Sequence, residues 1–64
     1  MNPMTSREVI RLLKKNGWHE VPAVGGHRQF KHPSYPNKVT VPFHNRSLSP
    51  KTLASILKDA GLRD

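Results

Sequence analysis

The fold is decided by the stretch over residues 25–32, which reads GGHRQFKH. A Gly-Gly pair before six residues without Gly or Pro is typical of a turn that leads into a strand, here residues 27–32. Side chains alternate across a strand, so a strand with Phe30 in the core carries every second residue on its other face. Those residues are His27, Gln29 and Lys31. The stretch therefore predicts a strand with one buried face and one polar face.

Two further strands are expected beside this one. Trp18–Val24 forms the first, although Pro22 suits only an edge or an interruption. Lys38–Phe43 forms the third, after a loop over Pro33–Asn37. In the third strand Val39, Val41 and Phe43 share the buried face, and Lys38 and Thr40 share the other. Trp18 and Phe43 are expected to be core aromatics, which leaves Tyr35 in the loop as the aromatic free to stack on a base.

A helix is predicted on each side of these strands. Thr5 and Glu8 have the spacing of a capping box, and Gly17 ends a helix over residues 6–16. Ser49 before Pro50 begins the last helix, and Gly61 ends it. The order is α-β-β-β-α. We expect an α+β domain spanning residues 1–64, in which a three-stranded antiparallel sheet has both helices on one face and is open on the other.

The length, net charge and cysteine count of the chain limit the classes of function that it can have. The chain has 64 residues, a net charge of +7 and no cysteine. A short basic chain favours a polyanionic partner bound on an exposed face. No apolar run approaches the ~20 residues of a membrane span, and the first residues lack a signal-peptide core. The absence of cysteine excludes disulfides and thiol ligands and fits a cytoplasmic protein without a cofactor.

The open face carries the candidate site. His27 follows two glycines, which let a substrate backbone approach closely. Histidine ordinarily titrates near pH ~6.5 and could take the proton of a ribose 2′-hydroxyl without a metal ion. Phosphate and sugar contacts are expected from the residues around it. The set is Gly26, Arg28, Gln29, Lys31, Lys38, Thr40 and His44. The alternative interpretation is an ordinary solvated polar face.

The remaining histidines and the helical cations are not expected to be the main catalytic or binding groups. His32 lies on the Phe30 side and is interpreted as a half-buried structural residue, and His19 as surface. His44 is a second proton-transfer candidate. Zinc is not expected, because no histidine pair has helical i, i+4 spacing and acids are few. Six cations belong to the helices and are expected to serve solubility and steering: Arg7, Arg11, Lys14, Lys15, Lys51 and Lys58.

Three segments together resemble a known family. They are residues 25–33 (GGHRQFKHP), 39–44 (VTVPFH) and 53–62 (LASILKDAGL), preceded by the apolar helix around Val9–Leu13 and by Gly17-Trp18. In this order and without gaps they resemble the HicA toxins of bacterial and archaeal HicAB toxin–antitoxin systems. The resemblance covers nearly the whole chain.

The resemblance implies a double-stranded-RNA-binding-like fold and an mRNA interferase, a ribonuclease that arrests translation. It implies one essential histidine, which falls on His27. It also implies a HicB antitoxin that covers this histidine and contacts operator DNA through its own DNA-binding part, so that the toxin touches DNA only indirectly. One departure is that the family usually has Gly-Ser-His, where this chain has Gly25-Gly26-His27.

Two other functions fit the same sequence. A non-catalytic RNA-binding module would explain the fold and the charge but would give His27 no special task. A protein-interaction subunit with a basic face for an acidic antitoxin is compatible with the nuclease, because one surface can serve both. Loss of toxicity on His27→Ala separates the nuclease from the binding module.

Overall fold

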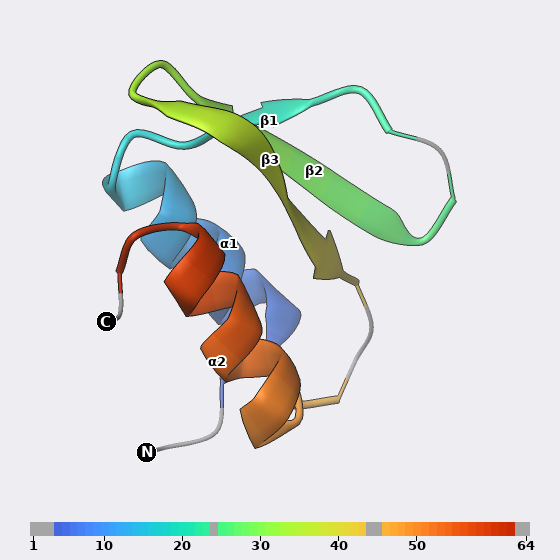
Figure 1. Cartoon of the computed structure of the whole chain (residues 1–64). Coiled ribbons are helices and arrows are strands. Elements are labelled where there is room, and N and C mark those ends of the chain that lie inside the picture. The colour runs from blue at the N-terminus through green and yellow to red at the C-terminus, as the bar shows by residue number, and fades with distance from the viewer. Residues whose placement is uncertain (1–3, 24, 44–45, 63–64) are drawn as a thin grey trace.

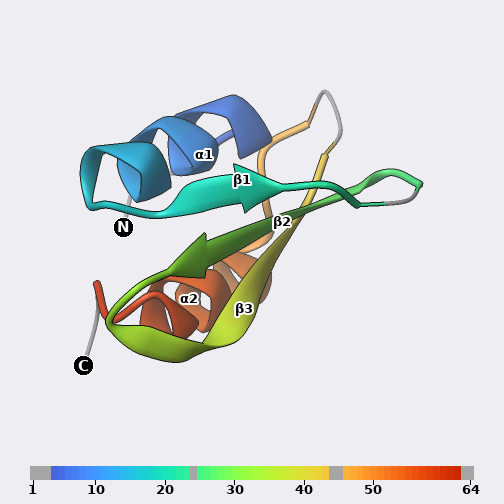
Figure 2. The same cartoon turned by 90° about the horizontal axis from the view of Figure 1, so that it is seen from above.

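The computed structural model describes residues 4–23, 25–43 and 46–62. Its elements are α1 (Ser6–Lys15), β1 (His19–Val21), β2 (His27–His32), β3 (Tyr35–Pro42) and α2 (Pro50–Asp59). The strands form an antiparallel sheet in the order β1-β2-β3. Both helices lie on one side of this sheet and the other side is open (Figure 1). Seen from above, α1 lies nearest β1 and α2 lies beneath β3 (Figure 2). The expected α+β fold is confirmed.

Local signals set the ends of α1. The Thr5 hydroxyl accepts a hydrogen bond from the Glu8 amide at 3.2 Å, and the Glu8 carboxylate accepts one from the Thr5 amide at 2.9 Å. The bond from the Thr5 amide, followed by that from its side chain, lowers the pKa of Glu8. At the other end Gly17 has φ +90°, and the Trp18 amide donates to the Leu13 carbonyl at 3.0 Å. The predicted capping box and glycine stop are both confirmed.

The ends of α2 follow the same logic. The Ser49 hydroxyl accepts from the Thr52 amide at 3.2 Å, and Pro50 is the first helical residue. Gly61 has φ +72°, and the Leu62 amide donates to the Leu57 carbonyl at 2.9 Å, which closes a Schellman motif. Neither described helix is long and apolar enough to cross a membrane.

The strand boundaries differ from those expected. β1 covers His19–Val21 and stops before Pro22, which cannot donate to a ladder, and Val24, the expected last residue of this strand, lies outside the described residues. β3 begins at Tyr35, where a loop was predicted, and Tyr35 pairs with His32 across a short turn. The sequence was misleading here because Pro36 looks like a loop residue. β3 is an edge strand, and an edge strand tolerates a residue without an amide hydrogen.

The core lies between the helices and the inner face of the sheet. It is formed by Val9, Ile10, Leu13, Trp18, Phe30, Val39, Val41, Leu48, Leu53, Ile56, Leu57 and Ala60. Trp18 is a core aromatic as expected, whereas Phe43 is 36% exposed and that expectation was wrong. β3 ends at Pro42, one residue before Phe43, so the alternation that would have buried its ring no longer applies. The buried Ser6 hydroxyl donates to the Pro42 carbonyl at 2.6 Å, which ties the start of α1 to this strand end.

At the end of the sheet where β2 leads into β3, three aromatic rings pack against one another. Tyr35 stacks on Trp18 with ring centroids 5.1 Å apart, and His32 packs edge-on against Tyr35 at 5.0 Å. His32 Nδ1 accepts from the Ser34 amide at 3.0 Å, so Nε2 carries the hydrogen and donates to the Asn16 carbonyl at 3.1 Å. The expected structural role of His32 is therefore confirmed. Tyr35 lies in β3 and not in the expected loop, and its side chain is 38% exposed, so stacking of a base on its ring stays a prediction.

Candidate active site

The pairing of β2 with β3 decides which side chains share the open face. His27 lies opposite Pro42, and Gln29 lies opposite Thr40. Phe30, opposite Val39, is fully buried on the inner face. Alternation from these pairs sets His27, Gln29 and Thr40 on the same open side of the sheet, as the sequence predicts.

An open groove of about 450 Å³ begins at this face and runs to α2. The sheet lines it with His27, Lys38, Thr40 and Pro42, and α2 lines it with Lys51, Thr52, Ser55, Ile56 and Asp59. β3 is an edge strand and lies above α2 (Figure 2), and side chains from both elements line this groove. We call this the His27 groove.

The helical side of the His27 groove was not foreseen. Lys51 was assigned to solubility and steering, but it lines the same groove as His27 and Lys38. It stands in the first turn of α2, which contains no acidic residue. The amides at a helix N-terminus carry partial positive charge, so Lys51 and this turn together attract an anion. The only sequence signal was Lys51 directly after an N-cap serine and a proline.

His27 itself is exposed and has no hydrogen-bond partner for its side chain among the described residues. The turn before it leaves room for a ligand. A Cβ built on Gly25 or on Gly26 would meet nothing within 4 Å. An imidazole with both nitrogens open to solvent, in a groove with two lysines, is able to take a proton from a bound phosphodiester's neighbouring hydroxyl.

The other predicted binding residues are spread more widely. Gln29 is half-buried beside Thr40, and Gly26 accepts a hydrogen bond from the Phe43 amide at 2.9 Å through its carbonyl. Lys31 pairs with His19 on the β1 side and does not line the His27 groove. His44 lies outside the described residues.

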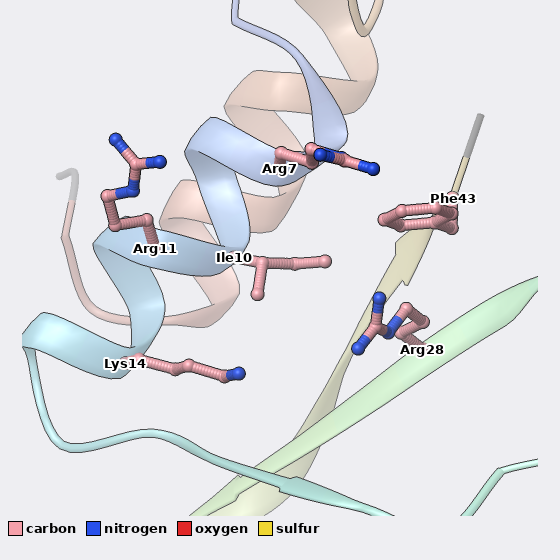
Figure 3. Close-up of a pocket in the computed structure, with 6 residues that line it drawn as sticks. All are labelled: Arg7, Ile10, Arg11, Lys14, Arg28 and Phe43. Carbon is pink, nitrogen blue, oxygen red and sulfur yellow. The ribbon is translucent and has the colours of Figure 1, made fainter. Parts of the chain in front are cut away.

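Arg28 faces the other way. It points to the α1 side of the sheet, beneath Phe43 (Figure 3). Its guanidinium donates to the Glu20 carboxylate at 2.5 and 2.7 Å. This hydrogen bonding, reinforced by the charges of Arg28 and Lys14, lowers the pKa of Glu20, and the same bond raises the pKa of Arg28. The expected phosphate contact of Arg28 is therefore not available within the His27 groove.

The charges of the His27 groove favour an anionic ligand. Lys38 and Lys51 contribute two positive charges and Asp59 one negative charge. The hydroxyls of Thr40 and Ser55 add neutral hydrogen-bonding groups that suit a sugar. Among the described residues, His, Asp and Glu side chains form no cluster of three or more that could hold a metal ion.

The comparison with family models agrees with the resemblance seen in the sequence. The model described as HicA toxin of bacterial toxin-antitoxin matches residues 6–62 of the chain. The match begins at the first residue of α1 and runs past the end of α2, so it includes every element that lines the groove. No curated protein matches the chain.

Proposed function

The chain belongs to the HicA toxin family of bacterial toxin–antitoxin systems, and from this premise we propose that it is a metal-independent endoribonuclease that cleaves mRNA and arrests translation. As a toxin of such a pair it has an antitoxin partner. The observation that supports cleavage is an exposed histidine without a protein partner, in a groove that it shares with Lys38 and Lys51.

In the proposed reaction His27 is the general base. It accepts the proton of a ribose 2′-hydroxyl, and the 2′-oxygen attacks the adjacent phosphorus. The bond from phosphorus to the 5′-oxygen breaks, and that oxygen takes a proton from water. The products are a 2′,3′-cyclic phosphate and a 5′-hydroxyl. Lys38 and Lys51 bind the phosphate oxygens, where negative charge grows in the transition state.

The neighbouring residues support binding of the RNA strand. Thr40 and Ser55 are positioned on the sheet and helix sides of the groove to hydrogen-bond sugar hydroxyls. Gly26, Gln29 and Lys31 extend the polar face next to it and bind the strand less directly. His44 is retained as a candidate proton-transfer group.

The partner proposed for this face is a HicB-like antitoxin that covers His27. An acidic protein surface is attracted by the same lysines that hold phosphate, so binding of the antitoxin excludes RNA. Contact with operator DNA is made by the antitoxin alone. We propose that the toxin acts in the cytoplasm, where mRNA is translated.

The test is cleavage of purified RNA in the presence of EDTA. We expect cleavage to persist and to leave 2′,3′-cyclic phosphate ends. His27→Ala should reduce the rate by about 10²–10⁴-fold, the usual contribution of general-base catalysis. His19→Ala is the matched control, because His19 is also an exposed strand histidine but lies outside the groove. It should change the rate by less than about two-fold.

Three outcomes would contradict the proposal. Loss of cleavage on chelation would refute a metal-independent reaction. An equal effect of the two histidine substitutions would remove the special role of His27. Intact RNA bound by the wild type and by both variants would indicate the non-catalytic RNA-binding module instead.

A further inference from the structure

A second groove lies on the opposite side of the sheet, against α1. It has a volume of about 380 Å³ and is lined by Arg7, Ile10, Arg11, Lys14, Arg28 and Phe43. Figure 3 shows four of these side chains on α1, with Arg28 and Phe43 facing them from β2 and from the end of β3. We call it the α1 groove. Nothing in the proposed reaction uses it.

The cations that line the α1 groove differ in whether an acidic side chain is bound to them. Lys14 lies 3.8 Å from the Glu20 carboxylate and Arg28 is bound to the same carboxylate, so both cations have an anionic partner, although its single negative charge offsets only one of them. Arg7 has no hydrogen-bond or ion-pair partner among the described residues. It reaches from α1 toward Phe43, whereas the guanidinium of Arg11 turns away from the strands (Figure 3). Arg7 is therefore the uncompensated cation inside the groove, and it stands in the first turn of α1, where the carboxylate of its neighbour Glu8 is bound to the Thr5 amide.

Phe43 supplies an aromatic surface next to that cation. Its ring is 36% exposed, and the guanidinium of Arg28 covers it at 4.8 Å from the ring centroid. The Phe43 backbone is fixed by the bond to the Gly26 carbonyl. A fixed, partly exposed ring beside a free guanidinium is a combination that binds one base and one phosphate of a single strand.

The two grooves meet at the same end of the sheet. His27 lies opposite Pro42, and both residues line the His27 groove. The residues that follow them in the sequence, Arg28 and Phe43, line the α1 groove. A strand that leaves the His27 groove around the turn at Gly26 thus arrives at Phe43. The two lysines of the His27 groove lie on its β3 and α2 sides, and neither of them lines the α1 groove.

We propose that the α1 groove binds a nucleotide that flanks the cleaved bond, with its base on Phe43 and its phosphate on Arg7. This inference rests on the proposed nuclease function. A protein partner is less suited to the groove, because Ile10 is only 7% exposed and Phe43 is the main apolar surface. Specific protein interfaces bury roughly 800 Å² on each partner around an apolar centre.

The test measures binding of single-stranded RNA to the His27→Ala protein, so that binding is separated from cleavage. Phe43→Ala in this background should weaken binding about 5- to 150-fold, the range expected for loss of one stacked base. Phe43→Trp, which keeps an aromatic face, should preserve binding. Arg7→Gln should weaken binding and reduce the slope of log affinity against log salt by about 0.7, the value for one phosphate of a single strand.

Lys15→Gln is the matched control for charge, because Lys15 is exposed on α1 and does not line the groove. An effect of Lys15→Gln equal to that of Arg7→Gln would reduce the result to general attraction and overturn the inference. Unchanged RNA affinity in both Phe43→Ala and Arg7→Gln would overturn it as well. Unchanged RNA affinity with loss of antitoxin binding would assign the groove to a protein partner instead.

The outcomes also separate this inference from the function on which it rests. Cleavage by the wild type together with RNA binding that ignores Phe43 refutes the α1 groove alone. Phe43-dependent binding without any cleavage refutes the catalysis and leaves the groove as a nucleotide site. Circular dichroism of each variant verifies that the fold is retained, and Arg7→Gln, at an exposed position, tests the groove without removing an aromatic ring.

Discussion

The two ends of β2 each carry a histidine, and the surroundings of the two histidines differ. His32 is held on both ring nitrogens and packs against Trp18 and Tyr35. His27 is exposed after a turn of two glycines, with no side-chain partner among the described residues. One strand thus supplies a closed end that holds the fold together and an open end whose histidine is exposed to solvent.

The difference shows what makes a histidine available for chemistry. A ring whose Nδ1 accepts and whose Nε2 donates is committed to one neutral tautomer, and taking a proton there would break the bond from the Ser34 amide. A ring with two free nitrogens loses nothing when it takes a proton. Residue type alone does not separate the two; their hydrogen-bond partners do.

The largest expected effect comes from exchanging each histidine for alanine. His27→Ala should lower RNA cleavage by about 10²–10⁴-fold and leave the free energy of unfolding within about 0.5 kcal/mol of the wild type. His32→Ala should do the reverse. It removes two hydrogen bonds and two ring contacts, which together stabilise by about 2–3 kcal/mol. Cleavage per folded molecule should remain.

Urea unfolding and single-turnover cleavage, measured on the same preparations, give both quantities. The comparison fails if His27→Ala proves as destabilising as His32→Ala, since the open end would then hold the fold as well. It also fails if the folded His32→Ala protein has lost cleavage.

A smaller effect is expected when serine replaces Gly17, next to His32, or Gly26, next to His27. Gly17 has φ +90°, and a Cβ there would lie 2.8 Å from His32 Nε2. Gly17→Ser should therefore cost about 2–3 kcal/mol, from left-handed strain and from disturbance of the bond between His32 and Asn16. Gly26 has open space around it, so Gly26→Ser, which introduces the serine expected here from the resemblance, should change stability by less than about 0.5 kcal/mol.

Thermal and urea unfolding of the two serine variants provide the measurement. Equal losses of stability would show that the turn before His27 is as constrained as the closed end. A hydroxyl at position 26 that donates to the charged phosphate in the transition state would in addition raise the cleavage rate by about 10- to 150-fold, the value of one hydrogen bond to a charged group.

The sequence predicted the parts of the molecule that depend on local chemistry. Thr5 with Glu8, and the glycines at 17 and 61, act within one helical turn, so their residues alone reveal the helix ends. Alternation along β2 likewise predicted that His27 and Phe30 face opposite sides.

The parts that it missed depend on how distant segments meet. Lys51 enters the groove because α2 lies under an edge strand, and nothing near Lys51 in the sequence encodes that position. Arg28 is drawn to Glu20, eight residues away on the neighbouring strand. Phe43 is exposed because its strand ends one residue earlier than the hydrophobic pattern suggests.

The smallest expected effect concerns pH, because the two ends are stabilised by different interactions. Near the open end, Arg28 binds Glu20 in contact with solvent, and this bond lowers the folded-state pKa of Glu20 below its ordinary 4.5. A lowered folded-state pKa means that the ion pair stabilises the protein above pH 4.5 and loses its effect as the pH falls through the lowered value. Glu20→Gln should therefore be less stable than the wild type at pH 7, and this deficit should shrink toward pH 3.

Urea unfolding of both proteins at pH 7, 4.5 and 3 measures the difference in their free energies of unfolding. Glu8, whose pKa is also lowered, is present in both proteins and cancels in the difference. A deficit that stays constant with pH would show that Glu20 acts through packing, and the open end would then be held in the same way as the closed one.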